Sequence, residues 1–109
     1  VTYGSSTLAG IGAVTNGDEI VAMYALLDPP VGTTNVVVSY NTAPNQYSVV
    51  GVATFTNVNQ TTPYGAFSSS TGTSTSPSLT LTSATGELVI SAVAIQSTAL
   101  TAVGVANGG

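Results

Sequence analysis

The chain has 109 residues, no Lys, Arg or His, and a formal net charge of −4. Nucleic-acid binding and attraction to anionic lipid both need cations, so this composition argues against both kinds of partner. The hydrophobic fraction of 43% indicates a single globular domain. No apolar run reaches the roughly 18 residues of a membrane-spanning helix, so no membrane insertion is expected.

The polar residues are mainly Ser, Thr, Asn and Gln, and the chain contains no Cys. Disulfides, structural zinc sites and cysteine catalysis are therefore excluded for this chain. The sequence also lacks the Lys residues that commonly blunt exposed sheet edges. This hydroxyl-rich, Lys-free composition favours an extracellular, cell-surface or virion-surface location.

The first half of the chain has the pattern of short strands and tight turns. Residues 1–3 and 7–14 are expected to be strands, and the second contains Gly10 and Gly12, which in a strand mark a bulge or a close approach of the backbone. Asn16-Gly17 predicts a two-residue type I′ hairpin turn. It leads into residues 19–27, a strand apolar on both faces and therefore expected to be buried on both sides.

The middle of the chain carries the strongest strand signal. Pro29 and Pro30 stop the preceding strand, because proline removes a ladder donor, and residues 35–40 predict a further strand. Tyr47 to Val58 is long, β-branched, aromatic and uncharged, which predicts a strand crossing the centre of a sheet.

The last third begins with residues 68–76, a hydroxyl-rich, low-complexity loop. Residues 79–82 and 87–95 predict two strands joined by a turn at 83–86. About seven to eight strands without a capped helix predict an all-β fold, an antiparallel two-sheet β-sandwich of immunoglobulin-like or jelly-roll type. Residues 1–97 would form this domain, and residues 98–109 a small apolar C-terminal strand or tail.

The residues needed for most catalytic mechanisms are missing. Without His, Cys or Lys, triads, Schiff bases and imidazole bases cannot form. Asp18 and Glu19 are adjacent and point to opposite faces of a strand, and Asp28 lies about 33 Å further along a straight strand. Glu87 begins another strand. No enzyme activity, catalytic residue or cofactor is predicted.

Two kinds of ligand site can be weighed from single residues. Asn16, Asp18 and Glu19 share one turn and could hold calcium, but a hairpin turn with solvated acids is favoured because the known loop spacings are absent, so no metal site is predicted. Tyr47 and Tyr64 border loops and are candidate glycan contacts, although ordinary packing is favoured for both.

Other side chains have simpler interpretations. Tyr24 and Tyr40 lie within apolar strands and are expected to pack in the core with hydrogen-bonded hydroxyls. Asn59-Gln60-Thr61 matches the N-glycosylation pattern, so Asn59 is a candidate glycosylation site in a host with that machinery.

Several motifs together resemble a recurrent β-sandwich module of bacterial secreted or surface proteins and phage structural proteins. The likeness spans roughly residues 1–97. It rests mainly on Pro-Pro-Val-Gly-Thr at 29–33 and Gln-Thr-Thr-Pro at 60–63, with Thr-Asn-Gly-Asp at 15–18 and Ala-Thr-Gly-Glu-Leu-Val at 84–89. The module is similar to immunoglobulin-like or jelly-roll sandwiches, its function is uncharacterised, and the resemblance implies no catalytic residue.

The chain departs from that module at two places. Related modules usually have an apolar strand before the segment that matches residues 1–3, and they are expected to have Asp at the position of Asn59. A processed chain, a truncated chain or a sandwich lacking one strand would each explain the first departure.

Two functions follow as hypotheses. The first is a non-enzymatic structural protein of an extracellular surface or virion, a filament subunit or decoration protein that forms homo-oligomers through β-strand edges. Its candidate strand-exchange segment contains Ala99, Leu100, Val103 and Val105, although this segment could equally form the last strand of its own sandwich. The second is a glycan-binding or adhesion module of a larger secreted protein, with a polysaccharide partner.

Overall fold

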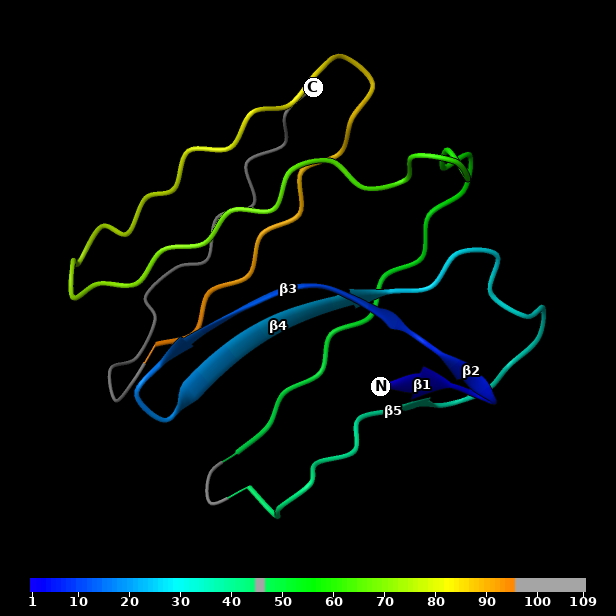
Figure 1. Cartoon of the computed structure of the whole chain (residues 1–109), viewed down its shortest axis with the longest axis horizontal. Coiled ribbons are helices and arrows are strands. Elements are labelled where there is room, and N and C mark those ends of the chain that lie inside the picture. Colours follow the sequence, from blue (N-terminus) through cyan, green and yellow to red (C-terminus); the bar gives the residue numbers. More distant parts are fainter. Residues whose placement is uncertain (45–46, 96–109) are drawn as a thin grey trace. The chain divides into compact units, whose positions relative to one another are not determined.

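The computed structural model describes residues 1–44 and 47–95, which form strands and turns without a helix (Figure 1). The strands in this part of the chain are β1 (Thr2–Tyr3), β2 (Ser6–Thr7), β3 (Ala9–Asn16), β4 (Glu19–Ala25) and β5 (Val36–Val37). They form one sheet in the order β2-β1-β5 and a second of β3 and β4. The predicted all-β, antiparallel class is confirmed, with five strands in the described residues rather than seven or eight.

The three-stranded sheet is small and antiparallel. Thr2 in β1 lies opposite Thr7 in β2 on one side and opposite Val37 in β5 on the other. Directly after β1, the backbone N–H of Gly4 donates to the carbonyl of Asn35 at 3.1 Å. This hydrogen bond extends the pairing of β1 with β5 by one residue. The sequence therefore located β1 and β5 correctly, but β5 is two residues long instead of the six predicted.

β3 and β4 form a hairpin whose turn differs from the prediction. The two residues between the strands are Gly17 and Asp18, one position later than expected. Gly17 has φ +59, whereas Asp18 is absent from the residues with positive φ. A positive φ at the first central residue alone is the pattern of a type II′ turn, which requires glycine there. The hairpin prediction is confirmed, and the type I′ prediction is wrong.

The expectation that residues 19–27 are buried on both sides is also wrong. Exposure alternates along β4: Glu19, Val21 and Met23 are half-buried, while Ile20 and Tyr24 are 65% and 48% exposed. This period of two is that of a strand with one covered face. The apolar side chains on the other face of β4 contact solvent.

The stretch expected to be the central strand, residues 47–58, is not a strand in the structure. The same holds for residues 79–82 and for residues 87–95. Figure 1 shows extended chain in these regions, which suits their β-branched and aromatic residues. A strand also needs a partner backbone about 4.8 Å away, and no ladder of hydrogen bonds joins these segments to their neighbours in the described part of the chain.

A close approach explains one of the glycines in β3. A Cβ atom placed on Gly12 would lie 2.6 Å from ring carbons of Phe67, closer than packed carbon atoms come. The ring of Phe67 therefore occupies the space that a side chain at position 12 would need. This is the close backbone approach that the sequence predicted for a glycine within this strand.

The described chain divides into two compact units. The first comprises Val1–Ala9 and Tyr24–Pro63, and it contains the three-stranded sheet. The second comprises Gly10–Met23 together with residues 64–95, and it contains most of the β3–β4 hairpin. The predicted C-terminal strand or tail, residues 98–109, lies outside the described residues.

Candidate functional site

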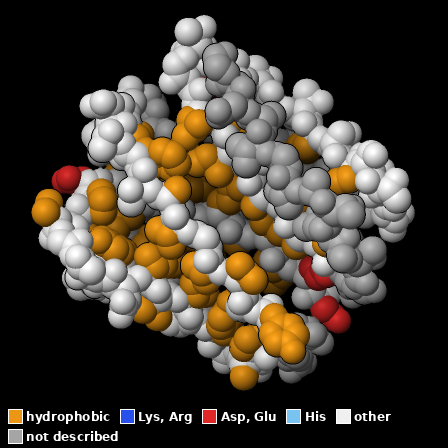
Figure 2. Space-filling model, turned by 180° about the vertical axis from the view of Figure 1, so that it is seen from behind, with side chains coloured by type: hydrophobic (Ala, Val, Ile, Leu, Met, Phe, Trp, Pro, Cys, Tyr) orange, Lys and Arg blue, Asp and Glu red, His pale blue; other side chains and the backbone are white. Residues whose placement is uncertain are grey.

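The surface of the described part of the chain carries many large apolar side chains. None of the described residues is fully buried, and large apolar side chains remain in contact with solvent (Figure 2). Val31 is 105% exposed and Val49 is 95% exposed. Isolated exposed apolar residues are ordinary, whereas large contiguous apolar patches are typical of interaction sites.

The strand edges are a second feature of this surface. β2 and β5 each pair with β1 on one side, and β3 and β4 pair with each other. Within the described residues, the opposite side of each of these four strands has no strand partner. Unpaired backbone N–H and C=O groups along such edges can pair with a strand of another chain.

The four carboxylates are distributed along the chain. Asp18 is exposed in the hairpin turn, and Glu19 is half-buried at the start of β4. Asp28 is exposed and has φ 47, and the Glu87 carboxylate accepts the backbone N–H of Ala84 at 2.7 Å. No group of three or more His, Cys, Asp or Glu residues that could hold a metal ion occurs among the described residues.

The tyrosines differ from their predicted roles. Tyr24 and Tyr40 are 48% and 52% exposed, so the expectation that they pack in a core is wrong. The expected hydrogen bond is present for Tyr40, whose hydroxyl lies 2.7 Å from the hydroxyl of Ser48. The hydroxyl of Tyr3 donates to the carbonyl of Gly32 at 3.1 Å.

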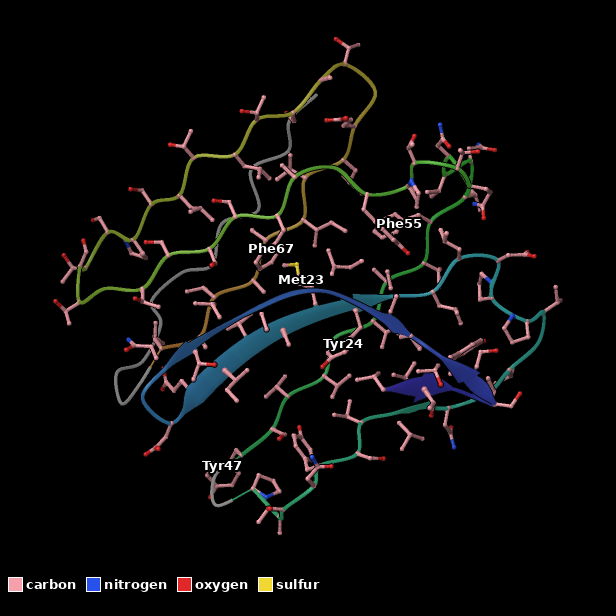
Figure 3. The ribbon with its side chains drawn as sticks, in the orientation of Figure 1. Met23, Tyr24, Tyr47, Phe55 and Phe67 are labelled. Carbon is pink, nitrogen blue, oxygen red and sulfur yellow. The ribbon has the colours of Figure 1, made fainter. Side chains whose placement is uncertain are left out.

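The two candidate glycan contacts belong to different units of the described chain. Tyr47 is wholly exposed (Figure 3), whereas Tyr64, at 42%, is less exposed than Tyr24 and Tyr40. Tyr47 belongs to the first unit and Tyr64 to the second. The remaining candidates, the segment with Ala99, Leu100, Val103 and Val105, lie outside the described residues.

Asn59, the candidate glycosylation site, organises its own turn. Its side-chain oxygen Oδ1 accepts the backbone N–H groups of Thr61 at 2.8 Å and Thr62 at 3.0 Å. The side-chain amide of Gln60 donates to the carbonyl of Val58 at 3.0 Å. This Asx-type turn leaves Asn59 on an exposed segment, where an enzyme that modifies its amide nitrogen can reach it.

A cavity in the second unit was not predicted from the sequence. Its volume is about 150 Å³. Three segments line it: the turn end of the β3–β4 hairpin, the Ser/Thr-rich segment of residues 68–76, and residues 92–95. Asn16 and Glu19 come from the hairpin, and Ser70, Thr71 and Ser74 come from the Ser/Thr-rich segment. Sequence patterns could not bring these residues together, because the segments lie far apart along the chain.

Comparisons with known proteins give no relative for this chain: no family model, curated protein or solved structure matches it. No helix in the described residues is long and apolar enough to cross a membrane. In its described residues, the structure shows antiparallel strands with open edges, exposed apolar side chains and a small cavity lined by polar and apolar residues.

Proposed function

We propose that this protein is a non-enzymatic structural protein of an extracellular surface or virion that self-assembles through its β-strand edges. It would act as a filament subunit or a decoration protein. One observation carries the proposal: a chain that is 43% hydrophobic has no fully buried residue in its described part. Removing apolar surface from water is the main favourable term in folding and association, so this surface favours association.

A second copy of the chain is the partner that fits this surface best. Each copy brings both an unpaired strand edge and exposed apolar side chains, so the two requirements are met by the same molecule. The chain has no Lys or Arg, so copies cannot attract one another through side-chain ion pairs. Backbone hydrogen bonds and apolar contacts would therefore supply the affinity, and a charge of −4 spread over 109 residues opposes it weakly.

We extend the proposal to the fold of the assembled state, a two-sheet β-sandwich. Residues 47–58, 79–82 and 87–95 have strand-like composition but lack ladder partners within the described chain. Pairing with a neighbouring copy would supply these partners. The exposed apolar side chains of these segments, among them Val49, Phe55 and Ile90, would then pack between two sheets.

The edge-pairing part of the proposal is tested with a matched pair of lysine variants. Ala22 is an exposed residue of β4, and Thr42 is an exposed residue outside the strands. Lysine on an edge strand opposes pairing with another strand. Sedimentation velocity should show smaller species for Ala22→Lys than for wild type and an unchanged distribution for Thr42→Lys. Equal assembly of both variants would argue against pairing at β4.

The strand-exchange form of the proposal concerns residues 99–106 and is tested separately. If Ala99, Leu100, Val103 and Val105 complete a neighbouring copy, a chain trimmed after Ser97 should remain smaller than the full chain at equal concentration. If the trimmed chain assembles like the full chain, the exchange model is wrong. Edge pairing through β4 would still stand in that case.

Glycan binding is the second candidate function, and the complete exposure of Tyr47 favours it. An exposed aromatic ring offers a flat apolar face, against which a sugar ring can stack. A polysaccharide array should then show binding that is lost in Tyr47→Ala or Tyr64→Ala. No binding across a broad panel would count against this candidate.

A further inference from the structure

The cavity in the second unit is lined by both polar and apolar side chains. The polar side chains that line it are a carboxylate, a carboxamide and hydroxyls, from Glu19, Asn16, Ser70, Thr71 and Ser74. Glu19 lies on the half-buried face of β4. The hydrogen bonds found between described residues do not include one to the Glu19 carboxylate.

One of these hydroxyls is already held in place. The Oγ atom of Ser74 accepts the backbone N–H of Ser76 at 3.0 Å. That bond uses an acceptor site of the hydroxyl and leaves its O–H hydrogen to donate elsewhere. Ser74 can therefore still donate and accept, as Asn16 can, whereas the Glu19 carboxylate can only accept.

The rest of the lining is apolar. Val14 and Val21 come from the hairpin, and Pro77 follows the Ser/Thr-rich segment. Val93 and Ile95 come from the last described segment. A ligand that fits this cavity therefore needs an apolar face and a set of hydroxyls. The volume of about 150 Å³ equals that of an apolar cavity that accepts benzene, and a hexose has twice as many non-hydrogen atoms, so one sugar ring enters the cavity only with part of its substituents outside it.

We infer that this cavity binds one six-membered ring of a neutral sugar, with its hydroxyls on Glu19 and Asn16 and its apolar face against Val21 and Val93. Sugar hydroxyls donate to the carboxylate and accept from Asn16 and Ser74. Neither Tyr47 nor Tyr64 lines the cavity, and binding there does not depend on self-assembly.

The chemistry of the lining argues against two other ligands. A calcium ion takes six to eight oxygen ligands and usually several carboxylates, but Glu19 is the only acidic residue that lines the cavity. An acidic sugar would place its carboxylate near Glu19, and the chain has no Lys or Arg to offset that repulsion. A neutral ring meets neither difficulty.

The experiment compares two neighbouring acids in the full chain. Glu19→Gln keeps the size of the side chain and removes its charge, and Asp18→Asn makes the same change in net charge at an exposed position that does not line the cavity. Binding of methyl glucoside, methyl galactoside, methyl mannoside and N-acetylglucosamine is measured by equilibrium dialysis and by saturation-transfer NMR. Both methods work on monomers and on large assemblies, so the result does not depend on the oligomeric state.

We expect at least one of these sugars to bind wild type and Asp18→Asn equally. Its affinity for Glu19→Gln should be about tenfold lower, because a hydrogen bond to a charged acceptor is lost. Thr71→Val, which replaces a hydroxyl by a methyl group, is the second variant and should also weaken binding. Three results would overturn the inference: none of the four sugars binds, the two acid variants bind equally, or calcium or glucuronate binds at Glu19 while neutral sugars do not.

Discussion

A Cβ atom placed on Gly12 in β3 would lie 2.6 Å from ring carbons of Phe67. This is the shortest such distance among the described glycines. Gly12→Ala should therefore lower the free energy of unfolding by about 1–3 kcal/mol, since overpacking forces neighbours to move. Urea denaturation at fixed protein concentration measures this. Gly51→Ala is the control, because a Cβ there meets nothing within 4 Å. Equal stability of both variants would contradict the contact.

Asn59 gives a second prediction, because its Oδ1 accepts the backbone N–H groups of Thr61 and Thr62. Asn59→Ala removes both bonds and should cost about 0.5–1.5 kcal/mol of stability. Asn59→Asp keeps an acceptor oxygen and should cost less. Thermal melts of the two variants distinguish these outcomes, and melts in the reverse order would be inconsistent with the turn.

Single residues were predictable where the cause was local. The pattern of β3 indicated a close approach at Gly12, but it could not name Phe67, which is distant in sequence. Tyr24 and Tyr40 were assigned to a core because of their apolar neighbours, and both are exposed. Burial depends on what packs over a residue, and the neighbours along the chain do not determine that.

Among the elements, the turn predicted at residues 83–86 is present one position later, at residues 84–87. The backbone N–H of Glu87 donates to the carbonyl of Ala84 at 3.1 Å, and Gly86 has φ +86. A positive φ at the third residue is the type II pattern, which favours glycine. Gly86→Ala should therefore cost about 1–2 kcal/mol. Gly65 has no positive φ, and a Cβ placed on it meets nothing within 4 Å. Urea melts should therefore give Gly65→Ala nearly the same stability as wild type.

Turns and the hairpin were predictable because a few adjacent residues determine them. Residues 47–58 were the strongest predicted strand, and the structure gives them no ladder partner. Strand composition favours an extended chain, but pairing depends on a second segment that the pattern does not identify. The cavity residues Glu19, Ser74 and Val93 were missed for the same reason, because three separate segments bring them together.

For the whole molecule, the proposal links strand content to assembly. If copies supply the missing ladder partners, far-ultraviolet circular dichroism should show more β-structure as the concentration rises, and dilution should reverse the change. The exposed apolar side chains provide the driving force. A spectrum that stays the same while the mass in solution increases would mean that copies associate without adding strands.

The central claim is self-association, and the mass in solution tests it most directly. Light scattering of the full chain over a range of concentrations, with electron microscopy of the same samples, gives the mass and form of every species. The proposal predicts masses that rise above the 10.7 kDa of a single chain as the concentration increases, with filaments or defined oligomers in the images. A mass of 10.7 kDa at every concentration would contradict it.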